Sequence, residues 1–447
     1  MKKFIETLRN IWRVEDLRSR ILVTLAFAAM YRFGSFIVLP GINPEALTAL
    51  RDQTNTGLLS LLNMFSGGAF SNASIFALGI MPYISASIVI QLFAFVVPYF
   101  QKMQREGESG RRKMNQYTRY LTILILLFQA PSYLINLRMT AAGAIVVENL
   151  TLFMLASTII LAAGSMFILW IGERITDKGI GNGVSLIIML GIIARLPQAF
   201  GQEVVSRLNN LTGGGLVMFI LELLLLFVVI LAAIMLVQGT RKVPVQYAKR
   251  MVAGQQVGGV RQYIPLKVFA ANVMPIIFAQ AIMFIPITLL GLLSDGQAAS
   301  PVLMALSDHT SWAYNLVFAV LIVAFTYFYT AITLNPVQMA EDMKRNNGFI
   351  PGIRPGKDTA DFLDRIMDHL TLPGSLFLAV IACMPAFAGL LNVKPEFAQF
   401  FGGTSLLILV GVVLDTLQQI ESHLLMRHYD GLLSSGRIHG RSGISSR

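Results

Sequence analysis

The chain has 447 residues, of which 55% are hydrophobic and 13% are charged, and its formal net charge is +11. A soluble domain has about 25% charged residues, so this composition excludes an ordinary water-soluble fold and indicates a membrane protein. The basic residues come in bursts between apolar runs, which is typical of loops that set membrane orientation rather than of nucleic-acid binding. The single cysteine, Cys383, excludes an internal disulfide framework and a cysteine metal site.

The N-terminal segment, residues 1–20, lacks the continuous apolar core and the small-residue cleavage site of a secretory signal peptide. Phe4, Leu8 and Ile11 recur at helical spacing, with basic residues on the opposite face. We expect an amphipathic helix that lies on the cytoplasmic face of the membrane. A helix that binds a partner protein is the alternative.

Apolar runs long enough to cross a membrane recur along the rest of the chain. A spanning helix needs about 20 mostly apolar residues. The predicted spans are residues 21–39, 75–98, 120–135, 152–171, 184–200, 216–236, 268–293, 312–333, 372–391 and 405–420.

Loop charge predicts the orientation of these spans, because cytoplasmic loops carry an excess of Lys and Arg. Segments 101–119, 239–267 and 335–371 are rich in basic residues. Segment 41–73 has only Arg51, and segment 294–311 has neither Lys nor Arg. Both termini are basic, which fits an even number of spans. We therefore expect both termini to be cytoplasmic.

The predicted fold is an all-α polytopic membrane protein of about ten spans. Ten spans divide naturally into two pseudo-symmetric halves of five, as in many conduction proteins. The residues themselves do not demonstrate a repeat, so the halves are an expectation. They would cover residues 21–200 and 201–425, with large cytoplasmic loops at 239–267 and 335–371 and a cytoplasmic tail at 426–447.

A short apolar segment, TGLLSLLNMFSGGAF at residues 56–70, is unusual because it is too short to cross a bilayer. Leu58, Leu61 and Leu62 favour a helix, and Gly67–Gly68 supply a C-terminal stop. Such a helix is either re-entrant and movable, as a plug of residues 57–69, or an interfacial helix that only completes a loop.

Several spans carry aliphatic residues one turn apart. Ile80 and Ile84 share a helical face with Pro82 between them, and Val184 and Ile188 repeat the arrangement. Aliphatic residues on membrane helices usually contact lipid or pack against other helices. A ring of them at one level would instead form a hydrophobic gate.

Motifs over nearly the whole chain resemble the SecY family of protein translocation channels. The stretches 74–93 and 170–187, the latter WIGERITDKGIGNGVSLI, resemble the two signature segments of that family. LNMFSGGA, REGESGRRK, VPVQYAKR, FIPGIRPG and FGGTSLLI match it in the same order. The resemblance implies a channel subunit that passes unfolded polypeptides and releases signal or transmembrane segments sideways into lipid.

The resemblance also implies roles for particular residues. An aliphatic pore ring would consist of Ile80, Ile84, Val184, Ile188, Ile277 and Ile408. The plug would include Leu58, Leu61, Leu62, Phe65, Ser66 and Gly67. Polar residues on a lateral gate would be Gln91, Gln129, Asn272 and Gln280, which either bond across the gate or serve as ordinary contacts between helices.

Cations in the cytoplasmic loops would dock the motor ATPase SecA or the ribosome, or would only mark topology. They are Lys242, Lys249, Arg250 and Arg354. Other implied partners are SecE-like and SecG-like small membrane subunits, polypeptides with signal sequences, and membrane lipid. The implied location is the bacterial cytoplasmic (inner) membrane.

Two rival classes fit the residues less well. An ion-coupled secondary transporter would need intramembrane relay groups, for which Glu222 and Asp415 are the candidates. A membrane enzyme would need catalytic or metal-binding groups within the spans, and all five histidines lie outside them. We expect no enzymatic activity and no cofactor. For Arg32 and Glu222, which are costly in lipid, we expect structural pairing.

Overall fold

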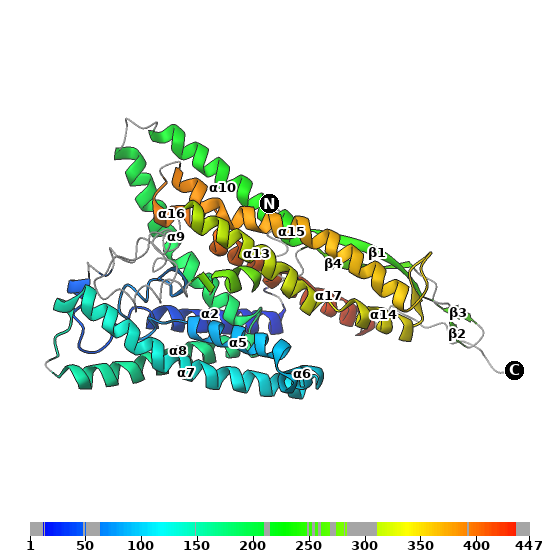
Figure 1. The fold of residues 1–447 in the computed structure, drawn as a ribbon, viewed down its shortest axis with the longest axis horizontal. Coiled ribbons are helices and arrows are strands. Elements are labelled where there is room, and N and C mark those ends of the chain that lie inside the picture. The colour runs from blue at the N-terminus through cyan, green and yellow to red at the C-terminus, as the bar shows by residue number, and fades with distance from the viewer. Residues whose placement is uncertain are drawn as a thin grey trace. The chain divides into compact units, whose positions relative to one another are not determined.

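The computed structural model describes residues 12, 14–47, 50, 63–147, 149–209, 215–247, 250–252, 255–257, 261–268, 274–280, 282–283, 311–390 and 393–434. Most of these residues are in helices, and a few are in short strands (Figure 1). The chain divides into two compact units. Unit 1 contains Met1–Leu47, Phe65–Ile192 and Val412–Arg447, and unit 2 contains Thr48–Met64 and Ile193–Gly411.

Among the described residues, seven helices are long and apolar enough to cross a membrane, or eight crossings if one sharply bent pair counts as a single span. The seven are Glu108–Thr140, Leu150–Lys178, Gly183–Asn209, Val217–Gln238, Trp312–Arg345, Lys357–Gly389 and Gly403–Leu424. Each overlaps a predicted span, and the bent pair overlaps the second one. Predicted span 1, residues 21–39, corresponds to α2 (Glu15–Gly34), which ends five residues earlier and is not among these helices. Predicted span 7, residues 268–293, lies largely outside the described residues, so the total of ten remains a prediction.

Unit 1 is built on α2 (Glu15–Gly34), α5 (Met81–Val96), α6 (Pro98–Arg105), α7 (Glu108–Thr140) and α8 (Leu150–Lys178), with the 3-10 turns η1 (Pro44–Leu47) and η2 (Ala142–Ala144). α7 packs against both α5 and α8, and α8 packs against α2. The packing is close, because a Cβ atom added at Gly164 of α8 would lie 2.1 Å from the carbonyl oxygen of Ile75. Glycine is therefore required where the chain before α5 crosses α8.

The second predicted span, 75–98, differs from the structure at both ends. Its helix begins at Met81, because residues 75–80 form turns, and Pro82 occupies one of the first two helical positions. The helix ends before Pro98, since Val97 is held in an extended conformation (φ −102°, ψ 117°). α6 then continues at an angle of 100° to α5. The pair is thus a broken span or a re-entrant turn.

Helices extend beyond the apolar runs into segments that the sequence predicted as loops. α7 begins at Glu108 inside predicted loop 101–119, and α15 (Lys357–Leu390) begins fifteen residues before predicted span 9 at 372. Hydropathy marks only the lipid-facing part of a helix, whereas pairs such as Arg112–Glu108, 2.8 Å apart and one turn apart, continue it in water. The predicted ends of these spans were therefore wrong.

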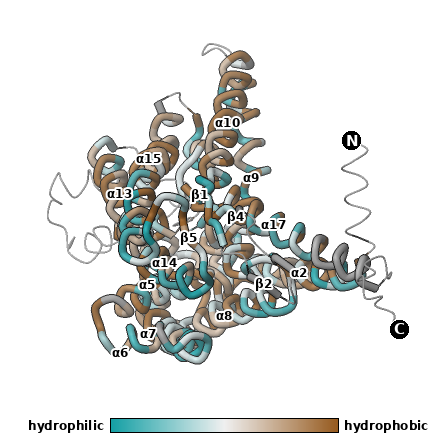
Figure 2. Tube along the Cα trace, turned by 90° about the vertical axis from the view of Figure 1, so that its right-hand side faces the viewer, coloured by the Kyte–Doolittle hydropathy of each residue, from teal (hydrophilic) through white to brown (hydrophobic). Residues whose placement is uncertain are grey.

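Unit 2 contains most of α9 (Gly183–Asn209), then α10 (Gly215–Gln238), α13 (Trp312–Thr333), α14 (Pro336–Arg345), α15, the short α16 (Pro395–Ala398) and the start of α17 (Gly403–Ser434). α13 lies alongside α15 (Figure 1). α10 is hydrophobic over most of its length (Figure 2). Its described side chains that are exposed, apart from that of the terminal Gln238, are large and apolar, as a lipid-facing helix requires.

Unit 2 also contains a small antiparallel sheet that corrects the all-α prediction to mostly α. β1 (Thr240–Tyr247) pairs with β4 (Arg261–Lys267) in the register Val243↔Ile264, and its far end pairs with β5 (Gly348–Phe349). β2 (Arg250–Val252) and β3 (Gln255–Val257) form a separate hairpin. Exposed and buried residues alternate along β1, with Val243 and Val245 buried. This period of two, visible in KVPVQY, was the missed signal.

Candidate functional site

The aliphatic positions of unit 1 lie where helices begin. Ile80 immediately precedes α5 and is 3% exposed, and its carbonyl accepts a hydrogen bond from the Ile84 N–H at 3.1 Å. The two residues are therefore one helical turn apart, as the sequence predicted. Val184 lies in the first turn of α9 and is half-buried, and Ile188 lies one turn later and is 5% exposed.

The start of α9 is fixed by hydrogen bonds from polar side chains. The Asn182 Oδ1 atom accepts from the Val184 and Ser185 N–H groups at 3.1 and 3.3 Å, which is the bonding of an N-cap. The Gly183 N–H donates to Thr176 Oγ1 on α8 at 2.9 Å. A Cβ added at Gly183 would lie 1.9 Å from the Gly172 carbonyl oxygen, so α9 starts in close contact with α8. This fixed start sets the direction of Val184 and Ile188.

The remaining two predicted pore-ring residues belong to unit 2. Ile277 is half-buried in a helical segment at residues 274–280, and Ile408 is 3% exposed in α17. Closure of all six residues into a ring therefore stays a prediction.

The described part of the predicted plug is its C-terminal end. Phe65 is the last residue of a short helical stretch and is 6% exposed, and Ser66 is 3% exposed. Gly67 and Gly68 follow with φ angles of +65° and +88°, the left-handed conformation that favours glycine at a helix stop. The predicted plug residues Leu58, Leu61 and Leu62 lie outside the described residues.

The C-terminal end of the predicted plug and the residue that follows it are held by side chains of unit 1. The Arg32 Nη1 atom donates to the Gly67 carbonyl at 2.7 Å, and the Tyr133 hydroxyl donates to the Phe70 carbonyl at 2.8 Å. The Arg32 guanidinium also lies over the Phe36 ring, 4.6 Å from its centroid. Structural pairing of Arg32, predicted from the sequence, is thus confirmed.

The predicted gate residues have different surroundings. Gln91 donates to Ser87 Oγ on its own helix at 3.2 Å, and Gln129 is exposed on α7. Gln280 is 4% exposed. Asn272 falls outside the part of the chain that the structure describes. A hydrogen bond across a gate stays a prediction for all four.

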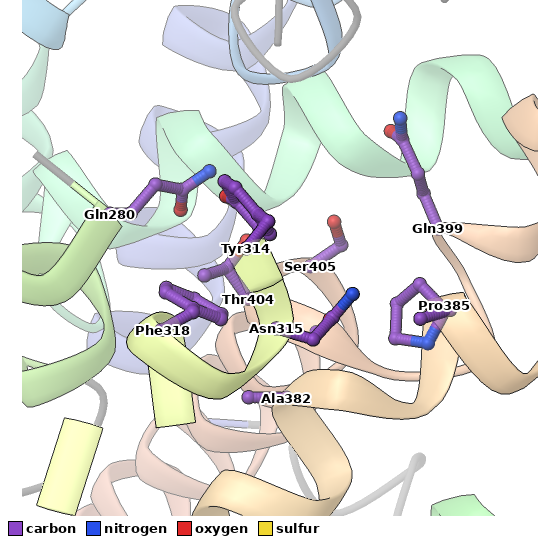
Figure 3. A pocket seen from close by; sticks show the side chains of 11 residues that line it. Gln280, Tyr314, Asn315, Phe318, Ala382, Pro385, Gln399, Thr404 and Ser405 are labelled. Atoms are coloured by element: carbon purple, nitrogen blue, oxygen red, sulfur yellow. The ribbon is translucent and has the colours of Figure 1, made fainter. Parts of the chain in front are cut away.

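Gln280 borders a cavity of about 50 Å³ within unit 2. Side chains of α13 and of the start of α17 face the same space (Figure 3). Its lining combines apolar walls with amide and hydroxyl groups: Gln280, Tyr314, Asn315, Phe318, Ala382, Pro385, Ala386, Gln399, Gly403, Thr404 and Ser405. The cavity has room for little more than water.

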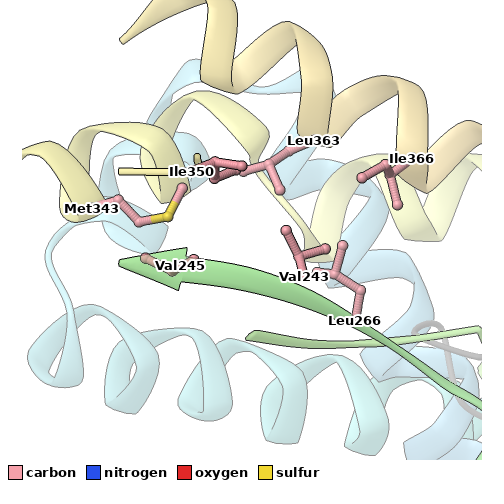
Figure 4. Packing of buried hydrophobic residues seen from close by; sticks show 7 residues of the cluster. All are labelled: Val243, Val245, Leu266, Met343, Ile350, Leu363 and Ile366. Atoms are coloured by element: carbon pink, nitrogen blue, oxygen red, sulfur yellow. The ribbon is translucent and has the colours of Figure 1, made fainter. Parts of the chain in front are cut away.

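The loop cations rest on a small hydrophobic core that joins the sheet to α14 and α15. Side chains from the helices face the strands (Figure 4), and the buried members are Val243, Val245, Leu266, Met343, Ile350, Leu363 and Ile366. This core joins the described parts of the two basic loops into one layer within unit 2.

Two of the four predicted docking cations, Lys242 and Arg354, are exposed. Lys242 alternates with the buried valines of β1 and is exposed. Arg354 is exposed in the turn before α15, where its carbonyl accepts from Thr359 Oγ1 at 2.8 Å and Gly352 and Gly356 have φ angles of +87° and +110°. Lys249 is outside the described residues, and of Arg250 only the backbone, in β2, is described.

A buried cluster of charges within unit 2 was only half predicted. Arg207 Nε donates to Glu203 Oε1 at 2.8 Å, and Arg207 Nη2 donates to Glu222 Oε1. The second oxygen of Glu203 accepts from the Lys394 N–H at 2.9 Å. The pairing of Glu222 is confirmed, whereas Glu203 and Arg207 were missed because span 5 was ended at residue 200 and α9 continues to Asn209.

Comparison with known proteins identifies the family. The SecY family model matches residues 74–417. The protein translocase subunit SecY of Halalkalibacterium halodurans is 45% identical over 432 residues, which covers 96% of this chain and 99% of the relative. The chain belongs to the SecY family, and it is a channel protein rather than an enzyme.

Solved structures show the same fold at lower identity. A structure concerning the SecY plug domain, described as stabilising the closed state and maintaining a membrane seal, has a TM-score of 0.61 at 19% identity and covers 91% of this chain and 92% of that one. Sec61 in a canine ribosome–channel complex has a TM-score of 0.58 at 20% identity, with the same coverage. The fold is therefore that of protein-conducting channels of the SecY and Sec61 type.

Proposed function

We propose that the chain forms the path by which unfolded secretory polypeptides cross the bacterial cytoplasmic membrane, with both termini in the cytoplasm. The observation that carries the proposal is 45% identity to a translocase subunit over 96% of the chain. The aliphatic helix starts, the Gly-stopped segment at Phe65–Gly68 and the basic loop layer support it. The rival transporter loses one of its two candidate relay groups, because Glu222 pairs with Arg207.

The pore ring would seal the resting channel because aliphatic side chains bind neither ions nor water. Ile80, Ile84, Val184 and Ile188 of unit 1, with Ile277 and Ile408 of unit 2, offer no ligand to an ion, and a narrow apolar constriction tends to expel water. An extended polypeptide needs no fixed partner there and can slide. A resting channel would therefore leak little while a translocating chain still passes.

The plug and the lateral gate complete the resting state. A plug ending at Phe65, Ser66 and Gly67, with Leu58, Leu61 and Leu62 in its helix, covers the pore until a polypeptide enters. The gate carries Gln91, Gln129, Asn272 and Gln280, whose contacts are weak enough, about 0.6 kcal/mol per bond, for an apolar signal helix to displace. Signal and transmembrane segments leave through it into lipid.

The basic loop layer binds the ribosome or motor that delivers the polypeptide. Lys242 and Arg354 are exposed on a small hydrophobic core, and Lys249 and Arg250 lie in the same loops. Arginine and lysine suit the phosphates of ribosomal RNA and the carboxylates of a motor surface. The canine relative was solved in a ribosome–channel complex. We infer that the ribosome and a SecA-type motor use this layer, and that SecE-like and SecG-like subunits complete the channel.

The experiment places a photocrosslinking residue at Ile188, in membranes that hold a secretory precursor stalled partway across. A strong adduct with the precursor is expected. Leu224 of α10 is the control, because it is 59% exposed on an apolar helix and should give none. Absence of an adduct at Ile188, and also at Ile84 and Ile277, would overturn the assignment of the path.

A further inference from the structure

Arg32 is an arginine in the middle of an apolar stretch, AFAAMYRFGSF, where a charged side chain is costly. Its described partners are unusual, because neither is an acid. Its Nη1 atom donates to the Gly67 carbonyl at 2.7 Å, and its guanidinium lies over the Phe36 ring. The hydrogen bond of Arg32 therefore restrains one backbone carbonyl, that of Gly67.

In the segment Ser66–Phe70, which contains Gly67, every backbone carbonyl accepts a hydrogen bond. Ser66 Oγ accepts from the Phe70 N–H at 3.1 Å, and Ser71 Oγ donates to the Gly68 carbonyl at 3.0 Å. Tyr133 on α7 holds the Phe70 carbonyl. Two of these ties, from Arg32 and Tyr133, come from helices far away in the sequence, so they fix the segment to the body of unit 1.

Steric contacts fix the direction of the Gly67 carbonyl. A Cβ added at Gly67 would lie 3.1 Å from the Cα atom of Gly191 and 3.3 Å from Arg32 Nη1. Gly67 also has a φ angle of +65°, which side-chain-bearing residues rarely adopt. The backbone therefore turns between α9 and the Arg32 guanidinium, and the Gly67 carbonyl accepts its hydrogen bond from that charged group.

The division of the chain into units falls immediately before this segment. Met64 clusters with unit 2, whereas Phe65 and the residues that follow it, as far as Ile192, cluster with unit 1. Ser66 and Gly67, at the C-terminal end of the predicted plug, therefore belong to the packed body of unit 1. A charged donor gives a stronger hydrogen bond than a neutral one, so Arg32 makes the strongest of the ties described above.

We propose that Arg32 is a positioning residue that anchors the C-terminal end of the plug. The proposal rests on the proposed plug function. The anchor Ser66–Phe70 stays fixed on α2 and α7, and displacement of the plug takes place on the N-terminal side of Gly67. Loss of the guanidinium loosens the anchor, and the plug then leaves its closed position more often.

The test measures the ionic conductance of the resting full-length chain, with its small membrane subunits, in planar bilayers. Arg32→Ala is expected to raise the open fraction about tenfold, the factor that loss of one charge-assisted hydrogen bond supplies. Arg32→Lys, which keeps a cationic donor but loses the planar fork, should lie between Arg32→Ala and the unsubstituted chain. Arg18→Ala is the matched control, because Arg18 is exposed on the same helix.

Deletion of residues 57–64 separates the two claims. If the deletion raises conductance and Arg32→Ala does not, the anchor is overturned and the plug function stands. If the deletion leaves conductance unchanged, the plug function fails and the anchor fails with it.

Amide hydrogen exchange of the peptide 65–74 gives a second readout that does not depend on conductance. Faster exchange in Arg32→Ala and unchanged exchange in Arg18→Ala are expected, since the carbonyl tie restrains the backbone. Equal exchange in all three proteins would overturn the proposal. Should Arg32→Ala fail to assemble, Arg32→Lys carries both measurements, and values identical to the unsubstituted chain would overturn the anchor.

Discussion

Two arginines in apolar surroundings, one in each unit, are stabilised in opposite ways. Arg32 of unit 1 binds a neutral carbonyl and an aromatic face. Arg207 of unit 2 lies between two carboxylates, and the side chains of Glu203 and Glu222 are each only 1% exposed. The first site keeps its positive charge uncompensated by an acid among the partners described, and the second has two negative charges for one positive.

The difference predicts what each arginine is for. Removing Arg207 would leave two buried carboxylates without their cation, which the protein interior tolerates poorly. Removing Arg32 would leave only a carbonyl, a neutral group that water can reach or replace. A site built on paired charges fixes a structure permanently, whereas a site built on one carbonyl can be released and remade. The second kind suits a segment next to a moving part.

The largest effect is expected for Arg207→Met. Loss of one partner of a buried ion pair costs about 3–5 kcal/mol. We expect the purified protein to unfold at much lower temperature or to fail to accumulate in membranes. Arg345→Ala, an exposed arginine at the end of α14, is the control and should leave the unfolding temperature unchanged. A stable Arg207→Met protein would mean that the carboxylates have other cations.

A smaller loss is expected for Arg32→Met, about 1–3 kcal/mol, because only a carbonyl bond and a ring contact disappear. Thermal unfolding in the same detergent compares it directly with Arg207→Met. A lower unfolding temperature for Arg32→Met than for Arg207→Met would contradict the proposed difference between the two arginines.

The two acids should respond unequally. Both oxygens of Glu203 accept hydrogen bonds, whereas Glu222 Oε2 is buried and without a partner among the described residues. Glu203→Gln should therefore cost about 2 kcal/mol and Glu222→Gln about 1 kcal/mol or less, since an amide there also relieves the repulsion between the acids. Unfolding temperatures of the two single variants give the order. The reverse order would move the structural role to Glu222.

The smallest effect is expected for Tyr133→Phe, which removes one neutral hydrogen bond to the Phe70 carbonyl and costs about 1 kcal/mol. Exchange of the amides in 65–74 should rise less than in Arg32→Ala. An increase as large as that of the arginine variant would show that the neutral tie dominates the anchor.

Much of the fold could be predicted from the sequence because lipid imposes a strict rule on helices. Every apolar run within the described residues became helical, at least in part. The predicted helix ends were wrong where charged residues continue a helix, as at Glu108 and Lys357. A helical turn in water needs no apolar run, so hydropathy does not mark it. The sheet failed because Val243 and Val245 alternate over too few residues to stand out against spans of twenty.

The candidate site was predicted only as far as the family motifs reach. The one-turn spacing of Ile80 and Ile84, and of Val184 and Ile188, was predicted correctly. That the helices begin at these residues, where Pro82 and Asn182 define the starts, was not predicted. The hydrogen bond from Arg32 to Gly67 could not be predicted, because the two residues are 35 positions apart. Every residue also has a backbone carbonyl, so the residue type does not show which carbonyl accepts. Glu203 and Arg207 could have been predicted as a pair, because an acid and a base lie one helical turn apart. They were missed because predicted span 5 ended at residue 200 and α9 continues to Asn209.

The central claim is that aliphatic residues of both units meet at one constriction. It is tested by Ile84→Cys with Ile277→Cys, in a chain whose single native cysteine is replaced by Cys383→Ser. The account predicts that a short bifunctional thiol reagent links the pair in resting membranes, and that a stalled precursor abolishes the link. A Leu224→Cys and Ile277→Cys pair should not be linked in either state. If Ile84 and Ile277 are not linked at rest, or if the stalled precursor leaves their link unchanged, the pore ring is contradicted.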